Sequence, residues 1–98
     1  MPLTRATAWD TYLALTRGLL PTLAADPADT AALTSQLSRV ATRVARYAPL
    51  WGEHGLMLQA TLRHAVVLDR TGRHRDLATL MRLVADRLYL LSAGPHPS

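Results

Sequence analysis

The 98-residue sequence contains no cysteine, lysine, isoleucine, asparagine or phenylalanine, and Glu53 is its single glutamate. Without cysteine, the chain can form neither a disulfide nor a thiol-based catalytic or metal site. The codons for Lys, Asn, Ile and Phe are rich in A and T, so their joint absence indicates a bacterial genome of high GC content. The same bias accounts for a basic complement made of 11 arginines. Arginine usage is therefore no evidence by itself for phosphate binding.

Long apolar runs and catalytic motifs are missing as well. No apolar stretch approaches the roughly 20 residues that span a bilayer, and Arg5 and Asp10 interrupt the N-terminus where a signal peptide would be apolar. We therefore expect a cytoplasmic protein with no membrane contact. The sequence has no Glu-x-x-His, no His-x-x-x-His, no Gly-x-Ser-x-Gly and no phosphate-binding glycine loop. These absences predict a non-enzymatic protein with no catalytic residues, no metal and no cofactor.

The residues that are present favour a single helical domain. Hydrophobic residues make up 49% of the chain and charged residues 18%, which is typical of a folded protein. No segment alternates polar and apolar residues as a strand does. Apolar residues instead recur every three or four positions in four segments, at about 7–25, 27–47, 49–70 and 73–92. We predict an all-α fold, an antiparallel four-helix bundle of up-down-up-down order, in one domain at 1–92 with a flexible C-terminal tail at 93–98.

Prolines and one glycine mark the expected helix boundaries. Pro21 has no N–H to donate to the carbonyl of the preceding turn, so we expect the first helix to be kinked or split there. Asp26 and Pro27 suit the N-cap and the first position of the second helix. The third helix is expected to begin near Pro49. Gly72 fits the left-handed residue that follows its last turn.

The same periodicity predicts which residues form the core. In the first helix, the apolar face consists of Trp9, Tyr12, Leu13, Thr16, Leu19, Leu20 and Leu23. In the second helix, alternating steps of four and three residues connect Leu33, Leu37, Val40, Val44 and Tyr47, a spacing typical of packed helices. We therefore expect the aromatic rings of Trp9, Tyr12, Tyr47 and Trp51 to belong to the core rather than to a ligand site.

The third and fourth helices carry more apolar residues than one buried face uses. Five of them lie off the predicted core faces: Leu56, Met57, Val67, Leu83 and Leu90. Exposed apolar surface marks interaction sites, and most soluble oligomers are two-fold homodimers. We predict that these five residues form an interface, in a homodimer or with a partner protein. The alternative is an irregular bundle that buries all of them within one chain.

A cluster of basic residues surrounds the expected turn between the third and fourth helices. It contains Arg70, Arg73, His74 and Arg75, which we call the basic corner. The free N–H groups at the start of a helix carry partial positive charge, and guanidinium groups beside them favour anions. We consider the basic corner a candidate anion site. The alternative is a solvated turn whose charge is partly neutralised by Asp69 and Asp76.

Three further arginines follow one edge of the second helix. Arg39, Arg43 and Arg46 are spaced so that they share one side of the helix. They are candidates for contacts with a nucleic-acid backbone, an activity that the formal net charge of +4 permits without requiring. The alternative is a solubilising face, which the apparent lack of an aromatic residue among the arginines favours.

Together these features predict a small helical interaction module, a regulator, adaptor or assembly subunit, that self-associates through its third and fourth helices. The alternative function is a nucleic-acid-binding small subunit that uses the second-helix arginines and the basic corner. The sequence does not distinguish a second copy from a foreign partner. It also leaves open whether the small side chains of the second helix, such as Ser38 and Thr42, border a cavity that binds a ligand.

Overall fold

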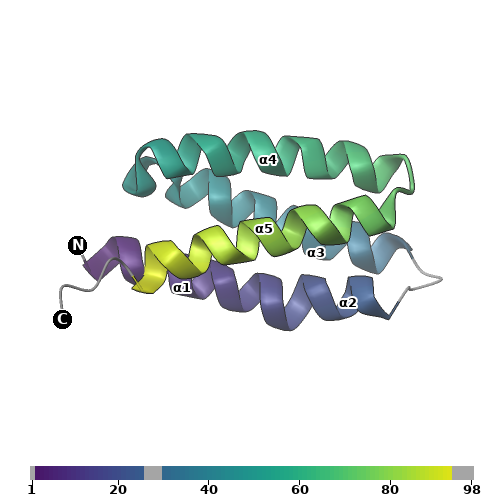
Figure 1. Ribbon diagram of the computed structural model, residues 1–98, viewed down its shortest axis with the longest axis horizontal. Coiled ribbons are helices and arrows are strands. Elements are labelled where there is room, and N and C mark those ends of the chain that lie inside the picture. The colour runs from purple at the N-terminus through teal and green to yellow at the C-terminus, as the bar shows by residue number, and fades with distance from the viewer. Residues whose placement is uncertain (1, 26–29, 94–98) are drawn as a thin grey trace.

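The computed structural model describes residues 2–25 and 30–93, which are helical apart from residues 25, 52 and 71–73 and contain no strand. The predicted all-α class is therefore confirmed. Figure 1 shows the helices lying side by side along the long axis of the molecule. No helix in the two described ranges is long and apolar enough to cross a membrane. The elements are α1 (Pro2–Ala14), a π-helical segment (Leu15–Leu19), α2 (Leu20–Ala24), α3 (Thr30–Tyr47), a 3-10 segment (Ala48–Trp51), α4 (Glu53–Arg70) and α5 (His74–Ala93).

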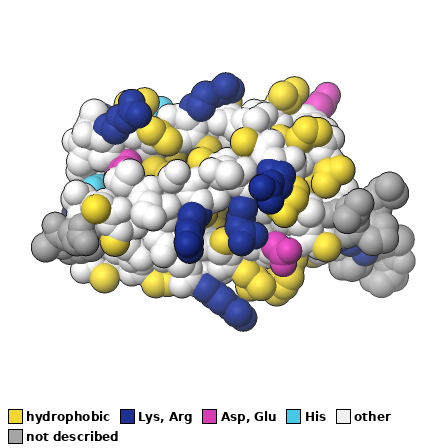
Figure 2. All heavy atoms as spheres, turned by 180° about the vertical axis from the view of Figure 1, so that it is seen from behind, with side chains coloured by type: hydrophobic (Ala, Val, Ile, Leu, Met, Phe, Trp, Pro, Cys, Tyr) yellow, Lys and Arg dark blue, Asp and Glu magenta, His cyan; other side chains and the backbone are white. Residues whose placement is uncertain are grey.

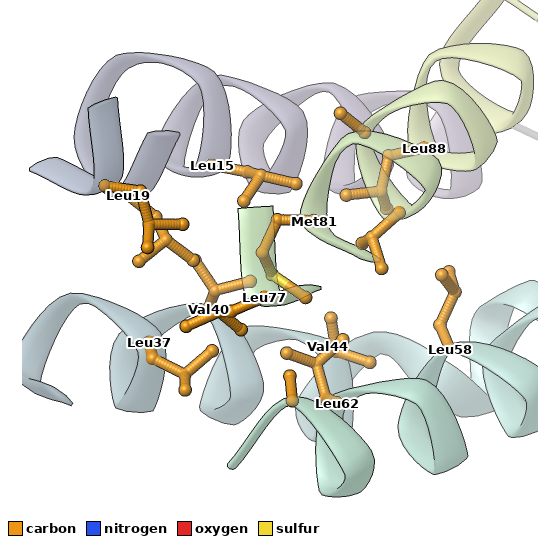
Figure 3. Packing of buried hydrophobic residues seen from close by; sticks show 14 of the residues in the cluster. Leu15, Leu19, Leu37, Val40, Val44, Leu58, Leu62, Leu77, Met81 and Leu88 are labelled. Atoms are coloured by element: carbon orange, nitrogen blue, oxygen red, sulfur yellow. The ribbon is translucent and has the colours of Figure 1, made fainter. Parts of the chain in front are cut away.

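The core lies between the helices and is built from leucine, valine and methionine. α5 packs along α1 and α4, while α3 packs against α4 and α1. Four of the five apolar residues predicted for the α3 face, Leu33, Leu37, Val40 and Val44, are buried, and Tyr47 is half-buried at its end. Figure 3 shows how the buried side chains converge, with labels on Leu15, Leu19, Leu37, Val40, Val44, Leu58, Leu62, Leu77, Met81 and Leu88.

The buried face of the first helix differs from the prediction. Trp9 is 43% exposed, whereas Ala8, Thr11 and Leu15 are fully buried. Small side chains at the start of α1 let its backbone lie close to α5, and the large rings are left at the edge of this contact. The buried hydroxyl of Thr11 is satisfied because it donates to the Thr7 carbonyl oxygen at 2.8 Å. The expectation that Trp9 lies in the core was wrong.

The π-helical segment explains how the buried face continues beyond Ala14. Its backbone closes with the wider hydrogen bond that the Leu20 N–H donates to the Leu15 carbonyl. The buried residues Leu15, Leu19 and Leu23 are spaced four apart. Each step of four overshoots a full α-helical turn by roughly 40°, and a π turn corrects this drift. Pro21 follows directly, in the first turn of α2, where a proline needs no donor.

The turn between α4 and α5 has the geometry predicted for Gly72. Its φ of 73° is left-handed. The Arg73 N–H donates to the Leu68 carbonyl at 2.9 Å, and the Gly72 N–H donates to the Asp69 carbonyl at 3.1 Å. This pair of bonds is the Schellman motif, which satisfies the last carbonyls of a helix. The turn therefore fixes the direction in which α5 leaves α4.

The connection between α3 and α4 is longer than predicted. The third helix was expected to begin near Pro49, but residues 48–51 form a 3-10 turn and α4 begins at Glu53. Trp51 anchors this turn, because its buried indole Nε1 donates to Thr7 Oγ1 at 3.1 Å. The predicted caps Asp26 and Pro27 lie outside the described residues. So does the predicted tail, apart from Ala93, which is the last residue of α5.

Candidate interaction surfaces

The five residues predicted for an interface are all exposed. The exposed fractions are 69% for Leu56, 51% for Met57, 53% for Val67, 60% for Leu83 and 63% for Leu90. The fold therefore does not bury these side chains within one chain, which was the alternative considered above. Exposure of a large apolar side chain to water is unfavourable in free energy. A cluster of such side chains on the surface is therefore a candidate interface.

Three of the five residues meet in one groove between α4 and α5. This α4–α5 groove has a volume of about 440 Å³, and Met57, Leu83 and Leu90 are among the residues that line it. Leu80 and Val84 add apolar surface from α5. Leu56 and Val67 are exposed on α4 but are not part of the groove lining. The structure therefore brings together three of the five predicted interface residues and leaves Leu56 and Val67 apart from them.

A second apolar cluster is aromatic and connects α5 with α1. Tyr89, next to Leu90 in the chain, contacts Tyr12 with 5.6 Å between ring centroids. Tyr12 in turn stacks on Trp9 at 5.2 Å and 21° between ring planes. We refer to Met57, Leu83, Leu90, Tyr89, Tyr12 and Trp9 as the apolar band. Tyr12 is half-buried against the core, as its place on the apolar face predicted, whereas the exposure of Trp9 was not predicted. The small residues Ala8 and Thr11 at helical spacing were the available signal.

The structure divides the basic corner between two places. Arg73 pairs with Asp76 at 3.0 Å across the first turn of α5, where both side chains are more than half exposed. Arg70 and His74 instead line a groove between α3 and α4. Arg75 is exposed and lines neither groove. Of the four residues, only Arg70 and His74 therefore border the same concave surface, and anion binding at the basic corner stays a prediction.

The α3–α4 groove is the larger of the two grooves, with a volume of about 710 Å³. Apolar side chains, those of Leu37, Ala41, Ala45 and Val66, provide part of its lining, and Thr30, Thr34, Ser38 and Thr42 contribute hydroxyl groups. Asp69 is the one acid among the lining residues, and it accepts a hydrogen bond of 2.8 Å from the Thr34 hydroxyl. The small side chains Ser38, Thr42 and Ala45 border an open groove here.

The α3 arginines border a second hollow beside this groove. Arg39, Arg43 and Arg46 line it together with Tyr47, in a volume of about 520 Å³. Ser38 and Thr42 line both concavities, so they form the boundary between them. Figure 2 shows basic side chains gathered on this face of the molecule. Tyr47 is an aromatic residue among the arginines, contrary to the expectation from the sequence.

The described residues offer no metal site. Within the two described ranges, no group of three or more His, Asp or Glu side chains lies close enough together to hold an ion.

No protein-family model matches the chain, and neither a curated protein nor a solved structure is significantly similar to it. The surfaces themselves therefore provide the basis for a functional proposal.

Proposed function

We propose that this protein is a small, non-enzymatic interaction module of the bacterial cytoplasm that self-associates through α4 and α5. Its helices form an antiparallel four-helix bundle of up-down-up-down order, and the first helix bends at the π-helical segment before Pro21. The observation that carries the proposal is the exposure of Met57, Leu83 and Leu90 around one groove. Burying these side chains against another chain would be favourable at roughly 25 cal/mol per Å² of apolar surface.

A second copy of the chain is the partner that best suits the α4–α5 groove. Leu83 and Leu90 are seven residues apart, the spacing at which two helices pack along each other. The groove is also lined by Asp86 and Arg87, which carry opposite charges. In a two-fold dimer, the same patch of each copy forms both sides of the interface. Asp86 of one copy can then pair with Arg87 of the other.

Light scattering on the purified chain tests this proposal. The double variant Leu83→Asp/Leu90→Asp is expected to convert a dimer into a monomer, because each substitution places charge in the apolar contact. The matched control is Ala32→Asp/Ser35→Asp, which adds the same charge at two exposed positions of α3. An unchanged mass in a folded Leu83→Asp/Leu90→Asp protein would rule out self-association through this groove.

Binding of nucleic acid is the second candidate function. α3 carries Arg39, Arg43 and Arg46 and no acidic residue, and Tyr47 lines the same hollow. A base can stack on a tyrosine while arginines contact the phosphates. A labelled oligonucleotide should then bind at low salt, and Arg43→Ala should reduce the slope of affinity against salt by about one. Absence of binding at low ionic strength would dispose of this candidate.

A further inference from the structure

We propose that the α3–α4 groove is a docking site for an acidic amphipathic helix of a partner protein. The groove belongs to a different face from the one proposed for self-association, and its lining shares no residue with the α4–α5 groove. Three properties of the described residues support this occupant: the length of the groove, its apolar lining and the unpaired cations on either side of it.

The α3 wall of the groove is long enough to contact a short helix. Its lining residues on α3 run from Thr30 to Ala45, which corresponds to about 22 Å of helix axis, or about four turns. The exposed side chains between them, including Ser38 and Thr42, are small. Packed helices lie about 8–10 Å apart, and small side chains permit the closer approach. A helix of about four turns can therefore lie along α3.

The lining of the groove requires an apolar face on the occupant. Leu37 is buried, while Ala41 and Val66 are half-buried and Ala45 is exposed. Ala41, Ala45 and Val66 therefore form apolar surface that water contacts in the isolated chain, above the buried Leu37. A helix with one apolar stripe would cover it, which is how helix-in-groove recognition operates elsewhere.

The charges beside the groove require acidic flanks on that helix. Arg70 lies on the α4 side, and Arg39 and Arg43 lie beyond the boundary formed by Ser38 and Thr42. Within residues 2–25 and 30–93, the ion pair joins Arg73 to Asp76 and involves none of these arginines. The acid of the groove, Asp69, already accepts a hydrogen bond from Thr34. Carboxylates on both sides of an apolar stripe would complement this arrangement.

A nucleic acid would complement fewer of these features than an acidic amphipathic helix. Phosphates would satisfy the arginines, but a polar backbone over Ala41 and Val66 would leave the apolar lining unfilled. Only one aromatic residue, Tyr47, is among the residues that line either concavity. Nucleic-acid channels instead present successive aromatic rings to successive bases. The combination of apolar lining and separated cations favours a helix.

The test uses fluorescence anisotropy with a labelled synthetic peptide of about 16 residues, the length that spans the groove at 1.5 Å per residue. The peptide carries leucine at every third or fourth position and glutamate on both flanks of the leucine stripe. A peptide of identical composition, shuffled so that no stripe forms, serves as the control. We expect the amphipathic peptide to bind and the shuffled peptide to bind at least tenfold more weakly.

Variants of the chain locate the binding. Arg39→Glu/Arg43→Glu should raise the Kd at least tenfold, whereas Arg17→Glu/Arg82→Glu, an equal charge change at exposed positions outside both concavities, should leave it within twofold. Ser38→Trp fills the groove without changing charge and should abolish binding. Thr79→Trp, at an exposed position of α5, is its control. Circular dichroism verifies that each variant is folded.

Three results would overturn the proposal. The first is failure of the amphipathic peptide to bind. The second is an equal loss of peptide affinity in Arg39→Glu/Arg43→Glu and in Arg17→Glu/Arg82→Glu. The third is binding of a 16-nucleotide single strand more tightly than the peptide, if Arg39→Glu/Arg43→Glu abolishes that binding. The last result would establish the nucleic-acid function instead. The Leu83→Asp/Leu90→Asp protein should bind the peptide with an unchanged Kd. The docking proposal and the self-association proposal can therefore fail independently.

Discussion

Two glycines inside helices have different surroundings, although the sequence gives no sign of the difference. A Cβ added at Gly55 would overlap the carbonyl oxygen of Ala48 and lie 2.7 Å from its Cα. A Cβ at Gly18 would lie 2.8 Å from Gln36 Oε1, the end of a flexible side chain. Backbone cannot move aside as a side chain can, so only Gly55 is required by close approach.

Gly55→Ala should therefore destabilise the protein, and Gly18→Ala should not. The overlap at Gly55 is expected to cost about 1–3 kcal/mol, more than the helix propensity that alanine contributes. At Gly18 the same substitution should be neutral or stabilise by up to about 1 kcal/mol, because Gln36 can rotate away. Urea denaturation of both variants measures these changes. Equal destabilisation by the two would contradict the packing described for Gly55.

The size of the apolar side chains led to a partly wrong prediction of the buried face of α1. Trp9 and Tyr12 are the largest apolar residues of that segment, and size placed them in the predicted core. The structure buries Ala8 and Thr11 instead, because contact with α5 is close and admits only small side chains. Hydrophobicity along one chain does not encode how near a neighbouring helix lies. The exposure of Trp9 was missed for the same reason, whereas Tyr12 is half-buried against the core.

At the scale of the elements, the sequence signals for turns were more informative. The left-handed Gly72 was predicted from its place after the last periodic residue, and the two Schellman hydrogen bonds confirm it. The heptad-like spacing of α3 predicted its buried face. The π-helical segment was not predicted, because its evidence is the four-residue spacing of Leu15, Leu19 and Leu23, which looks like an ordinary helical face. Which residues border the α3–α4 groove depends on how α3 packs on α4, and no single segment specifies that.

The turn after α4 provides a prediction at this scale. Gly72→Ala should destabilise the protein by about 1–2 kcal/mol, because a side chain in the left-handed region meets its own backbone. Gly72→Asn should cost less, since asparagine tolerates this conformation. Chemical denaturation gives both values. If alanine were tolerated without loss, the positive φ of 73° at this turn would be in doubt.

On the scale of the whole molecule, two surfaces of different chemistry are lined by different residues, although α4 contributes to both. The apolar band has residues on α4, α5 and α1, whereas Arg39, Arg43 and Arg46 lie on α3 and Arg70 on α4. Self-association through the α4–α5 groove would leave the α3–α4 groove of each copy free. The proposed dimer would then offer two docking sites for acidic helices.

The central claim is that Met57, Leu83 and Leu90 form a contact between two copies of the chain. Multi-angle light scattering coupled to size-exclusion chromatography tests it directly. The wild-type protein should have twice the chain mass of 10.7 kDa, and Leu83→Asp/Leu90→Asp should have that mass once while retaining its helical circular dichroism. A wild-type protein that stays at 10.7 kDa at high concentration, or a folded double variant that remains a dimer, would contradict the account.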